Sequence, residues 1–189
     1  MIVTPAATAC RNRGFTLVEA LATIAVLSIV GLASSRLILE SSSRFTDAVT
    51  RSQLHATGTS AMSRIVSELG GVSPLSGVSP TAPNINSASS STSVTFVGSG
   101  GATRTITYNS GASTIIITGS AAASQTLASD CTAFSFTYLD STGGTISPAS
   151  GTSLIRRVVV QFTLSRAGVS ETIRTSVYIR SMMSGSGAS

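Results

Sequence analysis

One apolar stretch near the start of the chain limits what this sequence can fold into. Residues 15–35 read FTLVEALATIAVLSIVGLASS, and Glu19 is their only charged residue. At about 1.5 Å per residue, a helix of this length spans roughly the 30 Å hydrocarbon core of a bilayer. Arg11 and Arg13 precede it, with no acidic residue before Gly14. Because positive charges beside a membrane helix favour the cytoplasmic side, we expect a single pass with the N-terminus inside and the C-terminus outside.

Glu19 is an unusual residue for a membrane helix. A carboxylate at such a position costs at least about 2.5 kcal/mol and generally has a partner, but the apolar run contains no cation. Cleavage after Gly14 would give Phe15 a free α-amine, and the amine of a neighbouring copy could then pair with Glu19. An ordinary secretory signal would instead be cut after its apolar segment. A plain membrane anchor, with Glu19 reaching the membrane surface, would leave Gly14-Phe15 as a coincidence.

The sequence RGFTLVE at residues 13–19, followed by the apolar run, resembles the leader and N-terminus of type IV pilins and type II secretion pseudopilins. The resemblance implies that a prepilin peptidase cleaves after Gly14, removes the leader of residues 1–14 and methylates the amine of Phe15. It also implies that Glu19 aligns the subunit with others in a filament. The implied partners are the peptidase, other pilin or pseudopilin subunits and an inner-membrane assembly platform. The implied location is the bacterial inner membrane, with a periplasmic head, and then the filament.

A second helical pattern continues the membrane segment. Over residues 36–70, apolar residues recur at helical spacing, and Glu40 lies four residues before Arg44, which favours an ion pair. Two glycines at 70–71 predict the end of the helix. Gly58 weakens the helix near its middle and favours a kink or local unwinding there. The apolar residues expected to line one face are Ile38, Phe45, Val49, Met62, Ile65, Val66 and Leu69.

Residues 71–189 predict a head domain made of a loop and an antiparallel β-sheet. Residues 70–92 are rich in serine, proline and asparagine and predict a surface loop. A sheet that covers the helix gives an α+β fold, the pilin-like roll that the resemblance also implies. The order of elements is similar to that of minor pilins and the J-type minor pseudopilin. The expected strands, which have β character and are separated by glycine-rich breaks, are 94–97, 103–108, 114–118, 133–139, 155–164 and 172–180.

The remaining polar residues show no catalytic or metal-binding pattern, so we expect neither an enzyme nor a cofactor. His55 is the only histidine and lacks a companion ligand, so we expect a solvated helix residue. Asp140 begins a glycine turn that offers few oxygens to calcium, which favours a solvated turn. Cys131 is expected to be a buried, inert thiol, because Cys10 would leave with the leader and no internal disulfide can form in the mature chain.

Arginine is concentrated towards the last predicted hairpin. All 12 basic residues of the chain are arginines. A face rich in arginine could contact acidic groups of a filament neighbour or DNA, although no interleaved aromatic residues support base stacking. The simpler interpretation is an exposed strand face that arginine keeps soluble. The arginines in question are Arg156, Arg157, Arg166, Arg174 and Arg180.

Three functions are therefore compatible with the sequence. The leading hypothesis is a minor pilin or pseudopilin of a type IV pilus or type II secretion filament, because one cleavage would explain both Gly14-Phe15 and Glu19. The second is a competence pilin that captures DNA through the arginine-rich hairpin. The third is a lone exported domain, or an enzyme, anchored by the same helix.

Overall fold

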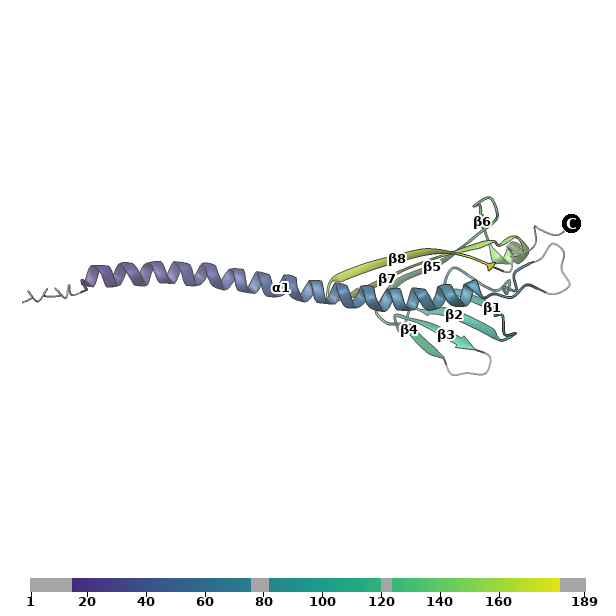
Figure 1. The fold of residues 1–189 in the computed structure, drawn as a ribbon, viewed down its shortest axis with the longest axis horizontal. Helices are drawn as coiled ribbons and strands as arrows, with labels where there is room; N and C mark the ends of the chain where they lie inside the picture. Colours follow the sequence, from purple (N-terminus) through teal and green to yellow (C-terminus); the bar gives the residue numbers. More distant parts are fainter. Residues whose placement is uncertain (1–14, 76–81, 120–123, 181–189) are drawn as a thin grey trace, which may run out of the picture. The chain divides into compact units, whose positions relative to one another are not determined.

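The computed structural model describes residues 15–75, 82–119 and 124–180 of the chain. These residues form one α-helix, α1 (Leu17–Gly70), eight β-strands and two short 3₁₀ helices (Figure 1). The arrangement confirms the α+β class predicted from the sequence, with a long N-terminal helix followed by antiparallel strands. Contacts divide the chain into two compact units, residues 1–46 and residues 47–189, and α1 contributes to both.

In the second unit, one face of α1 enters the hydrophobic core. The predicted face is confirmed at Met62, Ile65 and Leu69, which are buried. Ile38 and Phe45 are exposed instead, with 68% and 71% of their surface accessible. Leu54, Gly58 and Ala61 were not predicted for this face, and the last two lack the large apolar side chain by which a helical period is recognised. The buried residues of α1, most of them three or four residues from the next as helical geometry requires, are Leu54, Gly58, Ala61, Met62, Ile65 and Leu69.

Gly58 does not interrupt α1. The helix continues through it to Gly70, so the predicted kink or unwinding is wrong. A Cβ atom added at Gly58 would lie 2.1 Å from Cδ1 of Ile173 and 3.3 Å from Cδ1 of Leu164. Glycine therefore allows strand side chains to approach the helix backbone closely, and that packing offsets its low helix propensity.

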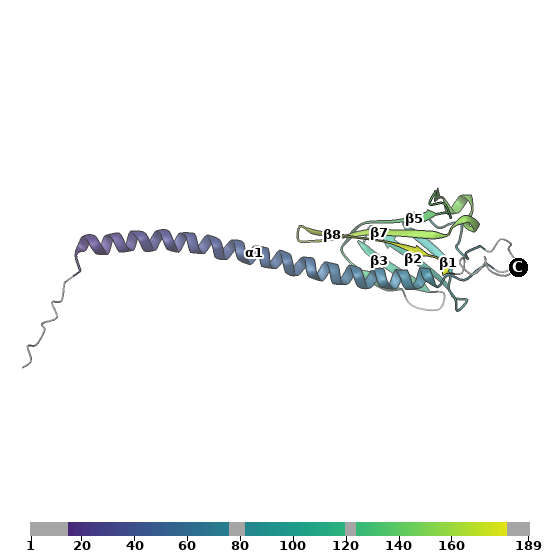
Figure 2. The same ribbon diagram turned by 45° about the horizontal axis from the view of Figure 1, so that its top comes forward.

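The strands form two antiparallel sheets, where the sequence analysis expected one. The first sheet has the order β1-β2-β3-β4 and the second has the order β6-β5-β7-β8 (Figures 1 and 2). Pairing between distant strands depends on tertiary contacts that local alternation does not encode. The strands of the first sheet are β1 (Ser93–Val97), β2 (Thr103–Asn109), β3 (Thr114–Gly119) and β4 (Gln125–Ala128). Those of the second are β5 (Cys131–Leu139), β6 (Thr145–Ile146), β7 (Arg157–Arg166) and β8 (Val169–Tyr178).

The predicted surface loop at residues 70–92 is partly wrong. Val72, Ala82 and Ile85 are buried, and bridges connect Val72 to Gly98 and Ile85 to Phe96. This segment therefore extends the edge of the first sheet near β1, while residues 86–88 are exposed. Apolar periodicity could not identify a segment that contributes only single buried residues between prolines.

Aromatic side chains connect the two sheets. Phe134 of β5 stacks on Tyr108 of β2 at 5.8 Å between ring centroids and on Phe162 of β7 at 6.2 Å. Phe136 meets Phe134 edge to face at 4.7 Å. Phe134, Phe136 and Phe162 are buried in the core, where each aromatic pair adds about 0.5–1.5 kcal/mol beyond its buried area.

Candidate functional site

The described chain begins at Phe15, directly after the predicted cleavage point. Gly14 and the rest of the expected leader lie outside the described residues. Phe15 is exposed over 70% of its surface. Thr16 then forms the cap of α1, because its carbonyl accepts hydrogen bonds from the backbone N–H groups of Glu19 and Ala20, each at 3.1 Å. Phe15 and Thr16 thus lie outside regular secondary structure and lead directly into the helix.

Glu19 lies in the first turn of α1, and this position is favourable for a carboxylate. The Glu19 backbone N–H also donates to Oγ1 of Thr16 at 3.3 Å. The pair Thr16 and Glu19 has the spacing of a capping box, in which a hydroxyl and an acid three residues later stabilise a helix start. The positive end of the helix dipole adds about 0.3–1 kcal/mol for a negative charge at low ionic strength. The role of Thr16 was not predicted from the sequence, although its three-residue spacing to Glu19 was a usable signal.

Glu19 has no cationic partner within the part of the chain that the structure describes. The ion pairs there involve other acids, and none places an arginine or histidine nitrogen within 4.0 Å of the Glu19 carboxylate. The side chain is exposed on the helix surface. Its helix therefore stabilises it locally but leaves its charge available to another molecule.

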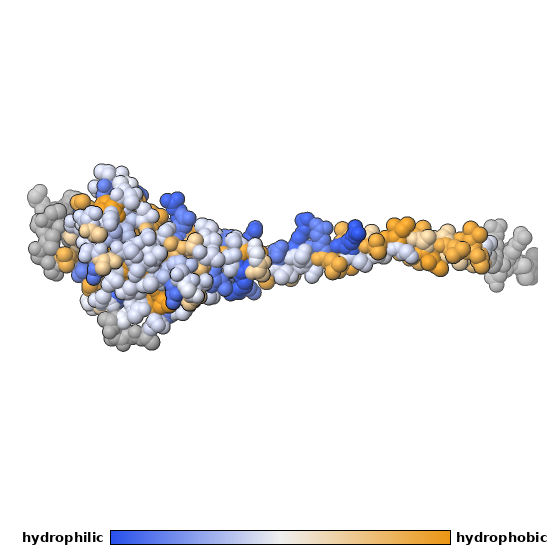
Figure 3. All heavy atoms as spheres, turned by 180° about the vertical axis from the view of Figure 1, so that it is seen from behind, coloured by the Kyte–Doolittle hydropathy of each residue, from blue (hydrophilic) through white to orange (hydrophobic). Residues whose placement is uncertain are grey.

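The N-terminal part of α1 has the surface of a membrane or bundle helix. It is the one described helix that is long and apolar enough to cross a membrane, and no part of that apolar window is buried. Figure 3 shows hydrophobic side chains, in orange, over this part of α1. Burying a leucine, isoleucine or valine side chain completely is more favourable than leaving it exposed to water by about 1.5–3 kcal/mol. These side chains therefore need either lipid or neighbouring helices around them.

Three of the hydroxyl groups in this apolar segment donate hydrogen bonds to carbonyls of the helix itself. Ser28 Oγ donates to the Ile24 carbonyl at 2.7 Å, and Ser35 Oγ donates to the Gly31 carbonyl at 2.8 Å. Thr23 Oγ1 donates to the Ala20 carbonyl at 2.9 Å. Such bonds remove the cost of placing a hydroxyl in hydrocarbon. Glu19 is thus the one side chain in residues 15–35 whose charge still needs a partner in an apolar setting.

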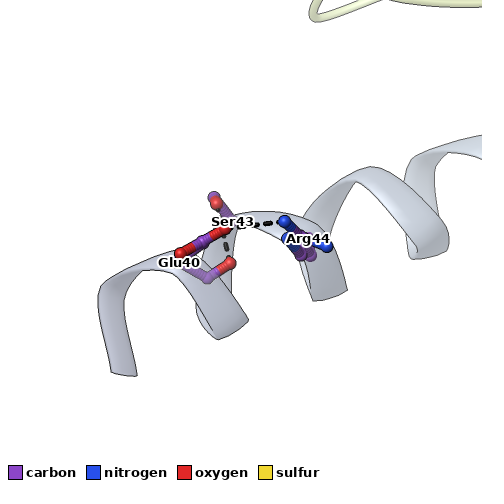
Figure 4. Close-up of polar contacts among 3 residues, drawn as sticks. All are labelled: Glu40, Ser43 and Arg44. Atoms are coloured by element: carbon purple, nitrogen blue, oxygen red, sulfur yellow. Dashed lines mark hydrogen bonds and ion pairs between the residues drawn. The ribbon is translucent and has the colours of Figure 1, made fainter. Parts of the chain in front are cut away.

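The polar part of α1 begins after the apolar segment. Arg44 Nη2 and Glu40 Oε1 lie 2.6 Å apart, as the four-residue spacing predicted, and Ser43 Oγ donates to the Glu40 carbonyl at 2.9 Å (Figure 4). Both charged side chains are exposed, so the pair contributes only about 0.3–0.5 kcal/mol. Its presence marks the position along α1 where a purely apolar environment would become unfavourable.

The arginines of the last hairpin lie in different places. Arg166 pairs with Asp130 at 2.5 Å, and Arg156 donates to the Ser153 carbonyl at 2.7 Å. Arg157 donates to the Tyr178 hydroxyl at 3.2 Å and stacks over its ring. Arg180 follows β8, and its Nε atom lies 3.9 Å from the point that a Cβ atom would occupy at Gly70, the last residue of α1. Arg157 and Arg174 both line a depression of about 360 Å³ on the second sheet.

The other residues singled out from the sequence are His55, Cys131 and Asp140, and each has contacts within the head. His55 Nδ1 lies 3.2 Å from Glu171 Oε1 and its side chain is largely exposed. Cys131 is fully buried at the start of β5, and burial raises the pKa of its thiol to about 11. The Asp140 carboxylate accepts hydrogen bonds from Thr142 and Gly144 within its own turn. Among the described residues, no group of three histidine, cysteine or acidic side chains could hold a metal ion.

Comparison with known protein families identifies the N-terminal region. Residues 10–35 match the family described as the prokaryotic N-terminal methylation motif. No curated protein matches the chain. The matched segment contains the expected cleavage point, Phe15 and Glu19, and extends through the apolar part of α1. The motif and the long helix on antiparallel sheets together support the assignment of this chain to the type IV pilin and pseudopilin family.

Proposed function

We propose that this chain is a filament subunit, a minor pilin or pseudopilin of a type IV pilus or type II secretion filament. The observation that carries the proposal is Glu19, an acid within the methylation motif whose own chain supplies no cation in the described residues. The likeness of the C-terminal elements to minor pilins and the J-type pseudopilin favours a minor subunit. A plain anchor would account for Glu19 only as a residue that stabilises the helix start, and it would leave the position of Glu19 within the methylation motif unexplained.

Processing would supply the missing charge. A prepilin peptidase cuts after Gly14 and leaves the α-amine of Phe15 as the new N-terminus. An α-amine has a pKa of about 7.7–8.0 and is therefore mostly protonated at neutral pH. Methylation of an amine keeps this charge. The cationic terminus of one subunit then pairs with Glu19 of the next, and the low dielectric of a helix bundle strengthens the attraction.

The same pairing explains how a membrane protein becomes a filament subunit. Before assembly, residues 15–35 cross the inner membrane and residues 36–70 continue the helix into the head formed by residues 71–189. The assembly platform would then move the subunit into a bundle of other pilin or pseudopilin helices. The bundle replaces lipid around the exposed apolar residues of α1, so the hydrophobic energy changes little. The Glu19 pair then supplies the register that apolar contacts alone do not specify.

The test is a comparison of two glutamates on the same helix. Mass spectrometry of the wild-type protein from cells with the peptidase should find a chain that begins with methylated Phe15. Glu19→Ala should be cleaved normally but enter filaments at least about tenfold less often, the effect of roughly 1.4 kcal/mol. Glu40→Ala removes an exposed glutamate paired with Arg44 and should assemble normally. An uncut chain in those cells, or normal assembly of Glu19→Ala, would refute the proposal.

A further inference from the structure

The second sheet has an open edge at β8. Strand β8 is the last in the order β6-β5-β7-β8, pairs with β7 along its whole length, and is ten residues long. An open edge of this length exposes a row of backbone N–H and C=O groups to which another strand can bond. Natural proteins commonly shorten such edges or place proline or charged side chains on them; β8 contains no proline, and Arg174 is the one charged residue on its exposed face.

The turn between β7 and β8 shows which backbone groups point outward. Arg166 and Val169 are direct partners across the two-residue turn of Ala167 and Gly168, whose φ angles are 51° and 81°. In such a turn the flanking pair is hydrogen-bonded, and bonded pairs then alternate along the ladder. At the other end of the hairpin, the Ile179 N–H donates to the Arg156 carbonyl at 3.2 Å. This pair is hydrogen-bonded as the same alternation requires. The residues of β8 whose backbone groups point away from β7 are therefore Ser170, Thr172, Arg174, Ser176 and Tyr178.

These outward-pointing groups are unoccupied by any described part of the chain. No hydrogen bond joins the backbone N–H or C=O of these five residues to another described residue. All five side chains are exposed, whereas the alternate residues face inward. Glu171, the one acid of β8, is among the inward set and lies against His55 of α1. The outer edge of β8 therefore has backbone groups available for pairing and exposed side chains. None of these exposed side chains is acidic.

Arg174 gives this edge a preference in charge. It lies near the middle of β8 and has no hydrogen bond or ion pair with a described residue. Arg157, which lines the same depression, is held by Tyr178. Val159 forms part of the lining between them and is almost fully buried. A carboxylate on an incoming strand would therefore find one guanidinium that has no partner among the described residues.

We propose that β8 binds an extended segment of another protein by strand addition, with an acidic side chain of that segment opposite Arg174. A second copy of β8 fits less well, because its outward residues offer an arginine and no carboxylate. Backbone hydrogen bonds supply the affinity in this mode, and alternate side chains supply the specificity. The inference goes beyond filament assembly through α1 and depends on neither cleavage nor methylation.

The experiment uses the full chain in detergent micelles and a fluorescent peptide with threonine and valine alternating around a central aspartate. Anisotropy should show saturable binding, and a peptide with lysine at the centre should bind about tenfold more weakly. Methylation of alternate peptide amides on the pairing side should abolish binding. Absence of saturable binding to the unmethylated peptide, or equal binding of the aspartate and lysine peptides, would overturn the proposal.

Variants of β8 separate the backbone from the charge. Ser176→Pro removes an outward N–H without breaking the ladder to β7 and should weaken binding about tenfold, while Ser176→Ala should not. Arg174→Glu should reverse the preference toward the lysine peptide, while Arg51→Glu, the same charge change on exposed α1, should not. Unchanged binding by Ser176→Pro, or an unchanged preference in Arg174→Glu, would show that the peptide binds elsewhere.

Discussion

Ile173 of β8 places its Cδ1 atom where a side chain at Gly58 of α1 would begin, 2.1 Å from the Cβ position. Leu164 of β7 approaches the same point from the neighbouring strand. The last hairpin therefore contacts the helix at the one residue of α1 in the second unit that lacks a side chain before Gly70. This contact explains why a helix-weakening residue lies in the buried face of α1.

Because this contact is so close, the effect of Gly58→Ala on the stability of the head should change sign when Ile173 is also replaced by alanine. Gly58→Ala should destabilise the head by about 1–2 kcal/mol, because overpacking outweighs the gain of about 1 kcal/mol in helix propensity. In an Ile173→Ala background the 2.1 Å contact is gone, and the remaining 3.3 Å contact with Leu164 Cδ1 needs only a small shift of that side chain. The same substitution should then stabilise the head. Chemical unfolding of the detergent-solubilised chain, followed by circular dichroism, measures both values.

Thr59→Ala is the matched control for the Gly58 cycle. Thr59 is exposed on the same turn of α1, so its replacement should give only the few tenths of a kcal/mol expected from helix propensity in both backgrounds. Equal effects of Gly58→Ala in the two backgrounds would contradict the close contact seen in the structure.

The sequence predicted those features that local pattern controls. Apolar period identified α1 to within two residues of its ends, and alternation identified β1, β2, β3, β5, β7 and β8. It missed β4 and β6, which have four and two residues, because a pattern of period two needs a longer run to be recognised. The division into two sheets and the contact at Gly58 depend on residues far apart in sequence, and no local signal reports them.

The candidate site was predictable for a different reason. A lone acid in an apolar run is visible in the sequence without any knowledge of tertiary contacts, and the methylation motif covers it. The surroundings of the arginines in the last hairpin were less predictable. Strand register and the positions of neighbouring acids give Arg156, Arg157 and Arg166 different partners, although these arginines are close in sequence. Asp130, for example, pairs with Arg166 from a different part of the chain.

Glu68 joins α1 to β2 and should contribute more to stability than either of its partners. Its carboxylate lies 2.8 Å from Arg64 Nη2 and also pairs with Arg104, and its side chain is only 12% exposed. Glu68→Ala would leave two arginines close together without a counter-charge, so we expect a loss of about 1–3 kcal/mol in unfolding free energy. Arg64→Ala removes an exposed partner on the same helix and should cost about 0.3–0.5 kcal/mol. Urea unfolding measures both, and equal effects would contradict this role of Glu68.

Asp140 should titrate below the ordinary value of an aspartate. The Thr142 hydroxyl donates to its carboxylate at 2.7 Å, as does the Gly144 backbone N–H, and these bonds lower its pKa from 3.8. Because the folded pKa is the lower one, the stabilisation is present above pH 3.8 and is lost as pH falls through the folded value.

Carboxyl NMR of the labelled aspartates should therefore give an Asp140 midpoint below 3.8 in the folded chain. Thr142→Ala should raise that midpoint, because it removes the largest stabilising bond to the charged form. Ser141→Ala, which removes a neighbouring hydroxyl from the same turn, should leave it unchanged. A midpoint at or above the ordinary value would show that the turn does not hold the carboxylate in solution.

Cys131 should be nearly inert toward thiol reagents while the head is folded. Its side chain is fully buried at the start of β5, and burial raises the pKa of the thiol from 9.0 to about 11. At pH 8 the reactive thiolate is then about a hundredfold scarcer than in an ordinary cysteine, since each pKa unit changes its fraction tenfold. A Cys10→Ser chain leaves Cys131 as the only cysteine, so iodoacetamide labelling of that chain reports on one site. Labelling should be at least about a hundredfold faster in denaturant than in the folded state, and equal rates would place the thiol at the surface.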